Sequence, residues 1–190
     1  MYEAIGLLEL DSIAAGIEVA DVMVKAAPVD FVDAFMVTPG KYVVVVHGDP
    51  TSVGASVAAG RAVAGAALLD TMVIPFVHPQ VYAAIRTPRP AAADLALGFV
   101  ETASVATGIV AADDAAKAAE VELLQLHLAR GIGGKSILTV AGILADVQAA
   151  VEAGSRAARA SGRLVATRVL ANPHPDLVRR LAGGGPAAEA

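Results

Sequence analysis

Hydrophobic positions along the chain predict the same succession of strands and helices twice. Residues 3–10 are a short apolar run, and residues 42–47 are mostly Val, which is typical of a buried strand. Between them, apolar residues recur with helical spacing after Ser12, whose hydroxyl can accept a hydrogen bond from the first turn of a helix. The full pattern predicts strands at 3–10, 31–37, 42–47, 71–77, 95–101, 121–129, 136–141 and 164–170, and helices at 12–27, 51–67, 81–85, 104–119 and 144–160. Each half therefore has the predicted order βαββαβ.

The two halves are also copies of each other in sequence. Residues 4–29 align with residues 96–121 at a constant offset of 92, with 13 identities in 26 positions. Residues 40–60 align with residues 134–154 at an offset of 94, so the second copy carries two extra residues before Gly134. A repeat this regular indicates one fold built twice.

The repeat also predicts the domain organisation. We expect a first domain at 1–87 and a second at 94–182, each about the size of one small domain and each with a ferredoxin-like α+β fold. Residues 87–90 read Thr-Pro-Arg-Pro, which is too rich in proline for a helix or a strand, and they predict the linker. The glycine-rich end at 183–190 is expected to be a flexible tail.

Composition and charge exclude several classes of protein. A net charge of −5 and a pI near 5.3 provide no basic surface for nucleic acid or for an anionic membrane. The chain has no Cys, which removes disulfides, thiolate catalysis and the usual ligands of iron–sulfur clusters. No uncharged run reaches the length of a membrane span and no basic leader precedes the first strand, so we expect a soluble, cytoplasmic protein. Aromatic residues are scarce and small ones abundant, which favours close packing between subunits and predicts an oligomer.

Several of the repeated segments carry a family resemblance. The stretches TPGKYVVVVHGDPTSVGASVAAG, GIGGKSILTVAGILADVQAAVEAG and NPHPDL resemble the bacterial microcompartment shell domain, and the resemblance occurs twice in the same order. Two such domains in one chain resemble the tandem, trimer-forming shell proteins. The resemblance implies a homotrimer that forms a pseudohexagonal tile, packs against hexameric shell proteins and encloses a central pore for small metabolites. It also implies a place in the microcompartment shell and encapsulated enzymes as a further class of partner.

By the same resemblance, two turns form the rim of the pore. The pore-lining residues implied are Thr38, Pro39, Gly40, Gly131, Ile132, Gly133 and Gly134. In one tandem member of the family, a Cys before Pro-Gly-Lys holds an iron–sulfur cluster, whereas Thr38 stands at that place here. Hydroxyl groups cannot replace thiolates as ligands of such a cluster, so we expect no cofactor and no metal.

One of these turns also resembles a nucleotide-binding loop. Residues 129–136 read ARGIGGKS and differ from a Walker A motif only in the first residue, where Ala129 replaces Gly. A phosphate-binding loop leads into a helix, but residues 136–141 have the pattern of a strand. The segment is therefore predicted to be a hairpin turn with glycines at positive φ.

Four further residues are candidates for contacts at the edge of the tile. Lys25 and Lys117 occupy equivalent places in the two copies, and the resemblance implies that they meet lysines of neighbouring tiles. The alternative is a solvated helical lysine that pairs with an Asp four residues earlier. His78 and His174 both precede Pro at the end of a strand, which suggests an interface or a helix cap rather than catalysis. The Arg of the family's usual edge motif is absent beside both.

Two other functions are compatible with the pattern of residues. A duplicated ferredoxin-like domain could be a trimeric regulatory protein that binds a small molecule between subunits, and an isomerase or tautomerase-like enzyme could use similar interface pockets. Glu9 and Glu101 recur in the two copies, yet each lacks a nearby second group for acid–base chemistry in the sequence. His47 and His127 are isolated on predicted strands. We therefore expect a structural protein with no catalytic residue.

Overall fold

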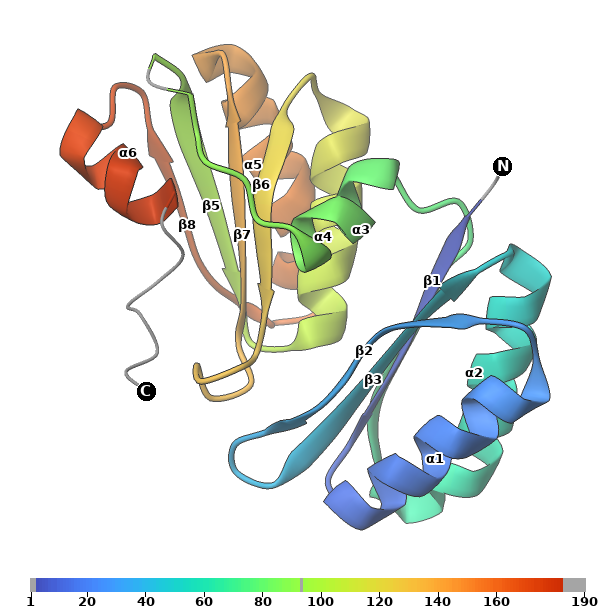
Figure 1. Ribbon diagram of the computed structural model, residues 1–190. Coiled ribbons are helices and arrows are strands. Elements are labelled where there is room, and N and C mark those ends of the chain that lie inside the picture. The colour runs from blue at the N-terminus through green and yellow to red at the C-terminus, as the bar shows by residue number, and fades with distance from the viewer. Residues whose placement is uncertain (1–2, 93, 183–190) are drawn as a thin grey trace. The chain divides into compact units, whose positions relative to one another are not determined.

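The chain forms two compact units in the computed structural model, which describes residues 3–92 and 94–182 (Figure 1). The first unit holds the chain up to Pro79 together with the turn 129–134, and the second holds residues 80–128 and the chain from Lys135 onward. The tail predicted at 183–190 lies outside the described residues.

The first unit is a four-stranded antiparallel sheet with two helices on one face. Its strand order is β2-β3-β1-β4, the ferredoxin-like order, and helices α1 and α2 pack against each other and on the sheet (Figure 1). The elements are β1 (Ala4–Leu10), α1 (Ile13–Ala26), β2 (Asp30–Val37), β3 (Lys41–Gly48), α2 (Pro50–Ala64), the 3-10 turn η1 (Gly65–Ala67) and β4 (Leu68–Ile74). The central strand β1 is buried along its whole length.

The second unit repeats this arrangement with strand order β6-β7-β5-β8. Helices α4 and α5 cover one face of its sheet. Helix α6 packs on the opposite face, where Val178 joins Leu97, Leu124 and Ala141 in a hydrophobic cluster. The elements are α3 (Pro79–Arg86), β5 (Ala96–Thr102), α4 (Val105–Ala118), β6 (Glu122–Leu128), β7 (Ser136–Gly142), α5 (Leu144–Ala160), β8 (Leu164–Leu170) and α6 (Pro175–Ala182).

Most elements lie where the hydrophobic pattern places them, with two exceptions. Helix α6 at Pro175–Ala182 was not predicted. The fourth strand was expected at 71–77 but runs from Leu68 to Ile74. Helix α2 ends at Ala64, and Gly65, at φ +52°, turns the chain into the strand three residues early. The next residues bend away, and the N–H groups of Phe76 and Val77 both donate to the carbonyl of Glu3.

At the start of three of the four long helices, a side-chain oxygen accepts hydrogen bonds from backbone N–H groups of the first turn. Ser12 and Ser104 lie at equivalent N-caps, and their hydroxyls accept from the backbone N–H three residues later, at 3.3 and 3.2 Å. Asp49 caps α2 by accepting from Thr51 and Ser52. Its counterpart Ile143 begins α5 with no such bond.

Close approach of backbone at glycines holds each helical layer on its sheet. A Cβ added to Gly6 or to its counterpart Gly98 would lie 2.6 Å from a Val side chain of the helix above.

The helices are short as well as closely packed. Among the described residues, none is long and apolar enough to cross a membrane.

Candidate functional site

The seven residues assigned to the pore lie on two equivalent hairpin turns. Thr38, Pro39 and Gly40 connect β2 to β3, and the longer second turn connects β6 to β7. Gly40 has φ +103°, and Gly131, Gly133 and Gly134 have φ between +67° and +84°, so the turns need glycine at these places. The segment that resembled a nucleotide-binding loop leads into strand β7, as predicted, and offers no helix N-terminus to a phosphate.

The longer turn belongs to the first unit, and within that unit Arg130 joins the turn to strand β2. Its Nη2 donates to both carboxylate oxygens of Asp33 on β2, each at 2.6 Å. The guanidinium also lies 4.3 Å from the centre of the Phe35 ring, where a cation is attracted by the face of an aromatic group. Comparison of the two copies does not reveal Arg130, because Arg130 stands in the two-residue insertion and has no counterpart in the first copy.

The lysines that follow the two turns are both ion-paired. Lys41 Nζ lies 2.8 Å from Oε1 of Glu9, and Lys135 Nζ lies 3.0 Å from Oε1 of Glu101. The glutamates that appeared isolated in the sequence therefore have partners across the sheet. The sequence could have indicated these two ion pairs, because the lysine and the glutamate recur together at equivalent positions in the two copies. The pairs reduce the positive potential that the lysines add beside the turns.

The first of these pairs is the more buried. The Glu9 side chain is only 4% exposed, and its Oε2 is buried without a hydrogen-bond partner among the described residues. Glu101 is 31% exposed. The two copies thus use the same pair in different surroundings.

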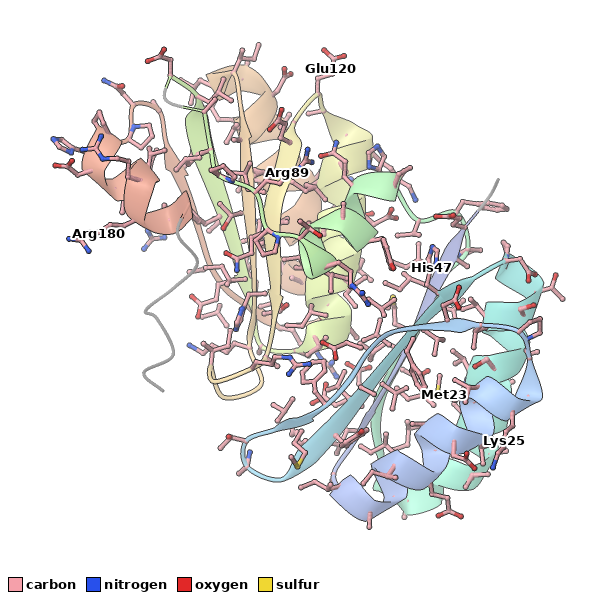
Figure 2. The ribbon with its side chains drawn as sticks, in the orientation of Figure 1. Met23, Lys25, His47, Arg89, Glu120 and Arg180 are labelled. Atoms are coloured by element: carbon pink, nitrogen blue, oxygen red, sulfur yellow. The ribbon has the colours of Figure 1, made fainter. Side chains whose placement is uncertain are left out.

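The four residues assigned to the tile edge lie at the ends of helices or just before them. Lys25 pairs with Asp21 at 2.5 Å and Lys117 with Asp113 at 2.6 Å, each one helical turn apart. Figure 2 shows Lys25 on the outer side of α1, and its side chain is 71% exposed.

Of the two histidines, His174 acts as a cap, because its Nδ1 accepts from the backbone N–H of Asp176 at the start of α6. His78 occupies the equivalent place before α3.

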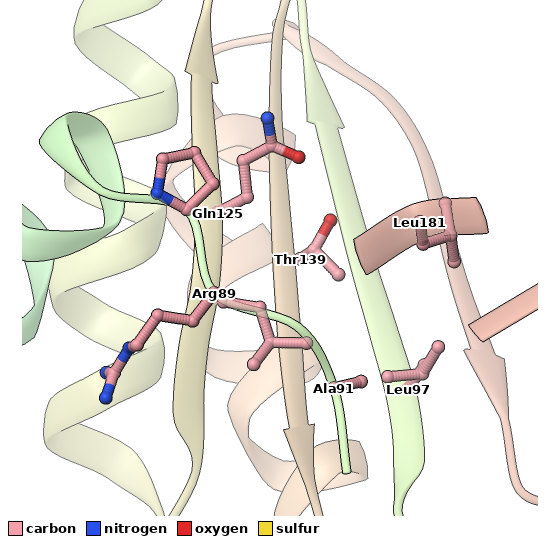
Figure 3. Close-up of a pocket in the computed structure, with 8 residues that line it drawn as sticks. Arg89, Ala91, Leu97, Gln125, Thr139 and Leu181 are labelled. Carbon is pink, nitrogen blue, oxygen red and sulfur yellow. The ribbon is translucent and has the colours of Figure 1, made fainter. Parts of the chain in front are cut away.

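Two hollows lie on the second unit. The first, between the linker, the sheet and α6, has a volume of about 20 Å³ and is lined by residues that include Arg89, Leu97 and Leu181 (Figure 3). It has room for about one water molecule. The second measures about 280 Å³, lies over β5, β7 and β8, and is mostly apolar, with Phe99 and Leu170 on its wall. Neither has the cluster of convergent polar groups typical of a metabolite site.

Comparison with known proteins agrees with this geometry. Residues 4–77 and 96–173 each match the model of the BMC domain, and the chain belongs to this family. Over 184 residues it is 41% identical to the bacterial microcompartment shell protein PduT of Citrobacter freundii, a match that covers 97% of this chain and 100% of PduT. It is also 39% identical over 82 residues to the shell protein EutM of Salmonella typhimurium, which covers 43% of this chain and 83% of EutM.

Solved structures show the same likeness. A microcompartment protein from Desulfitobacterium hafniense is 47% identical and superposes with a TM-score of 0.89, covering 94% of this chain and 99% of that one. The fused permuted hexameric shell protein MSM0275 shares the fold with a TM-score of 0.61 at 22% identity, covering 83% of this chain and 84% of that one. The resemblance inferred from the repeated segments is confirmed, as are the tandem α+β fold and the structural role in a shell rather than a regulatory one.

Proposed function

We propose that three copies of this chain form a pseudohexagonal tile in the shell of a cytoplasmic bacterial microcompartment. The observation that carries the proposal is the duplication, since a hexagonal tile needs six shell domains and each chain supplies two, which match the family model at 4–77 and 96–173. The match to PduT over its whole length supports it. The tile contributes structure to the shell, and no catalytic step is assigned to it.

A central opening for small metabolites completes the proposed tile. Threefold symmetry would bring the turns at Thr38–Gly40 and 131–134 from each chain to the axis. Gly40, Gly131 and Gly133 carry no side chain and have open space around them, so the polar backbone lines the opening, which favours small polar solutes. Three cationic side chains nearby, those of Arg130, Lys41 and Lys135, are paired with carboxylates, so the opening would be polar with little net charge.

The edge of the tile is proposed to meet hexameric shell proteins through Lys25, Lys117, His78 and His174. The exposed ends of Lys25 and Lys117 support this, because both lysines recur and both lie in the last turn of a helix. Lys25→Glu should weaken the formation of flat sheets with a hexameric shell protein. Asp21→Asn, which removes the partner but keeps the lysine, should leave sheet formation unchanged.

Light scattering of the purified chain tests the central proposal. The expected mass is that of three chains, and negative-stain microscopy should show hexagonal particles. A monomer, or a particle of six chains, would contradict the trimer. Particles without a hexagonal outline in the images would contradict the tile.

A further inference from the structure

Each unit has an outer end that lies opposite its own hairpin turn. In the first unit, β3 and β4 end there beside the start of β1, because Ala4 pairs with Gly48 and Ile5 with Ile74. In the second unit, β7 and α4 end and α5 begins at the corresponding place (Figure 1). If the turns of a tile meet at its axis, the outer ends form its perimeter. The first outer end carries Lys25, Asp49 and Phe76, and the second carries their counterparts Lys117, Ile143 and Asn172.

Phe76 is an exposed aromatic residue at the first outer end, and its backbone conformation is unfavourable. Its φ is +92°, which is rare for a bulky residue, and it is 56% exposed. Its N–H donates to the carbonyl of Glu3, which fixes the bend. At the offset of 96 that joins His78 to His174, its counterpart is Asn172, which is exposed and polar. Backbone strain that persists at an exposed residue indicates a functional contact.

The second outer end has exposed apolar residues at a different place. Ile143 is 64% exposed at the uncapped start of α5, and Leu144 beside it is 40% exposed. Their counterparts are Asp49, which caps α2, and Pro50. Isoleucine is among the poorest residues at an N-cap, so the second repeat has an apolar surface here at the expense of helix stability. Each outer end therefore has an apolar group where the other end is polar.

The two outer ends also differ in charge. Both have a lysine with an Asp one turn earlier, but Lys25 is 71% exposed and Lys117 is 45% exposed. The second end also carries Glu120, where the first has the uncharged Pro28. Figure 2 shows the Glu120 side chain directed outward at that end. Contact between unlike ends would bring Lys25 toward Glu120, whereas contact between like ends would bring equal charges together.

We propose that tiles of this chain also join one another directly, with the first outer end of one tile against the second outer end of the next. This inference rests on the tile of the proposed function and adds a second copy of the same tile as a partner at its edge. The two kinds of end alternate around three chains, so opposite sides of a tile are always of unlike kind. Tiles of one orientation therefore meet only through unlike ends, and this head-to-tail contact repeats without limit. The product is a flat layer in which Phe76 packs against Ile143 and Leu144.

Exchanging each residue for its counterpart in the other repeat tests the inference and preserves the fold. Phe76→Asn introduces a residue that tolerates positive φ, and Ile143→Asp supplies the missing cap. Each variant should remain a trimer in light scattering, and should need about tenfold more protein than the parent to form layers in negative-stain images. The matched control is Val63→Gln, because Val63 is 43% exposed but lies near the end of α2 farthest from Asp49. The control should form layers as readily as the parent.

The outcomes separate this inference from the proposed function. Layers at the parent's concentration from both test variants would overturn the inference, and so would a parent trimer that forms no layers. Both results would leave the tile intact. A parent chain that is not a trimer would contradict the tile itself.

Cysteine cross-linking identifies which ends meet, because the chain has no Cys of its own. In assembled layers, a chain that carries both Phe76→Cys and Ile143→Cys should be joined between tiles by a bifunctional thiol reagent, giving a ladder in denaturing gels. Each single variant should run as single chains, since like ends do not meet. Dilution of the double variant below the concentration for layers is the control, and it should remove the ladder. Joined chains from either single variant, or no ladder from the double variant in layers, would overturn the proposal.

Discussion

Asp114 on α4 is an acidic residue whose surroundings disfavour its charge. Burial raises the pKa of its carboxyl above 3.8, and the neighbouring charge of Asp113 raises it further, while Lys117 and Arg156 act in the opposite direction. The equivalent position in the first copy is Val22. A charge is thus present at a place where the other repeat manages without one.

Replacing Asp114 by Asn should stabilise the fold at neutral pH. A raised pKa in the folded state means that the protonated carboxyl stabilises the fold, and that this contribution is lost as the pH rises from about 3.8 through the raised value. Asp114→Asn should therefore melt at a higher temperature than the parent at pH 7, with the difference disappearing near pH 3. Thermal melts at fixed protein concentration measure it. A variant that is less stable at both pH values would contradict the prediction.

The missing cap of α5 gives a second prediction for a single residue. Ile143 stands at the N-cap and is 64% exposed, whereas its counterpart Asp49 accepts two backbone hydrogen bonds. A hydrogen bond from the Ser52 side chain, followed by that from the Ser52 backbone N–H, lowers the pKa of the Asp49 carboxyl. Ile143→Asp should raise the free energy of unfolding by about 1 kcal/mol in urea titrations. Ile143→Ala is the control, because it removes the same side chain without adding a cap. Equal stability of the two variants would contradict the prediction.

At the scale of elements, the two helices of each unit touch through glycine. Gly154 on α5 lies so close to α4 that an added Cβ would be 2.6 Å from the carbonyl oxygen of Ala111. In the first unit, Gly60 has flexible neighbours at a similar distance, the side chains of Leu8 and Met23. Backbone cannot move aside as a side-chain end can, so the contact between α4 and α5 is the less tolerant of the two.

Gly154→Ala should therefore destabilise the protein by about 1–3 kcal/mol. The matched control is Gly54→Ala on α2, where nothing lies within 4 Å of an added Cβ. That control should be more stable than the parent by about 0.5–1 kcal/mol, because alanine loses less conformational freedom in a helix. Urea denaturation measures both, and destabilisation by Gly54→Ala as large as that by Gly154→Ala would contradict the role of close approach.

At the scale of the whole molecule, the turn at 131–134 should limit what passes through the tile. Gly133→Trp is expected to reduce the passage of small polar solutes through assembled shells at least severalfold while the trimer persists. Gly162→Trp is the control, because both glycines have φ +67° and open space around them, but Gly162 follows α5 rather than lying on the hairpin turn. Solute release from loaded shells measures the effect. Loss of the trimer with unchanged permeability would place the turn at a subunit contact.

The sequence by itself determined the local architecture. Periodicity gave strands and helices such as α5 and β8 at their observed bounds, and the duplication predicted two copies of one order. The duplication also predicts the true bounds of β4, because subtracting the offset of 96 from the range 164–170 of β8 gives the observed range 68–74. Such features depend on nearby residues and on repetition, and both can be read from a single chain.

The tertiary structure decided which residues far apart in the sequence meet. The pairs of Lys41 with Glu9 and of Arg130 with Asp33 depend on sheet register and on the path of a turn, which hydrophobic spacing does not encode. Nor does the sequence reveal that α3, which ends the first repeat, packs at the edge of β6 in the second unit. Phe31 and Leu123 stand at equivalent places in the repeat, and only the fold leaves one exposed and the other buried, because only one of the two edges receives a helix from the same chain.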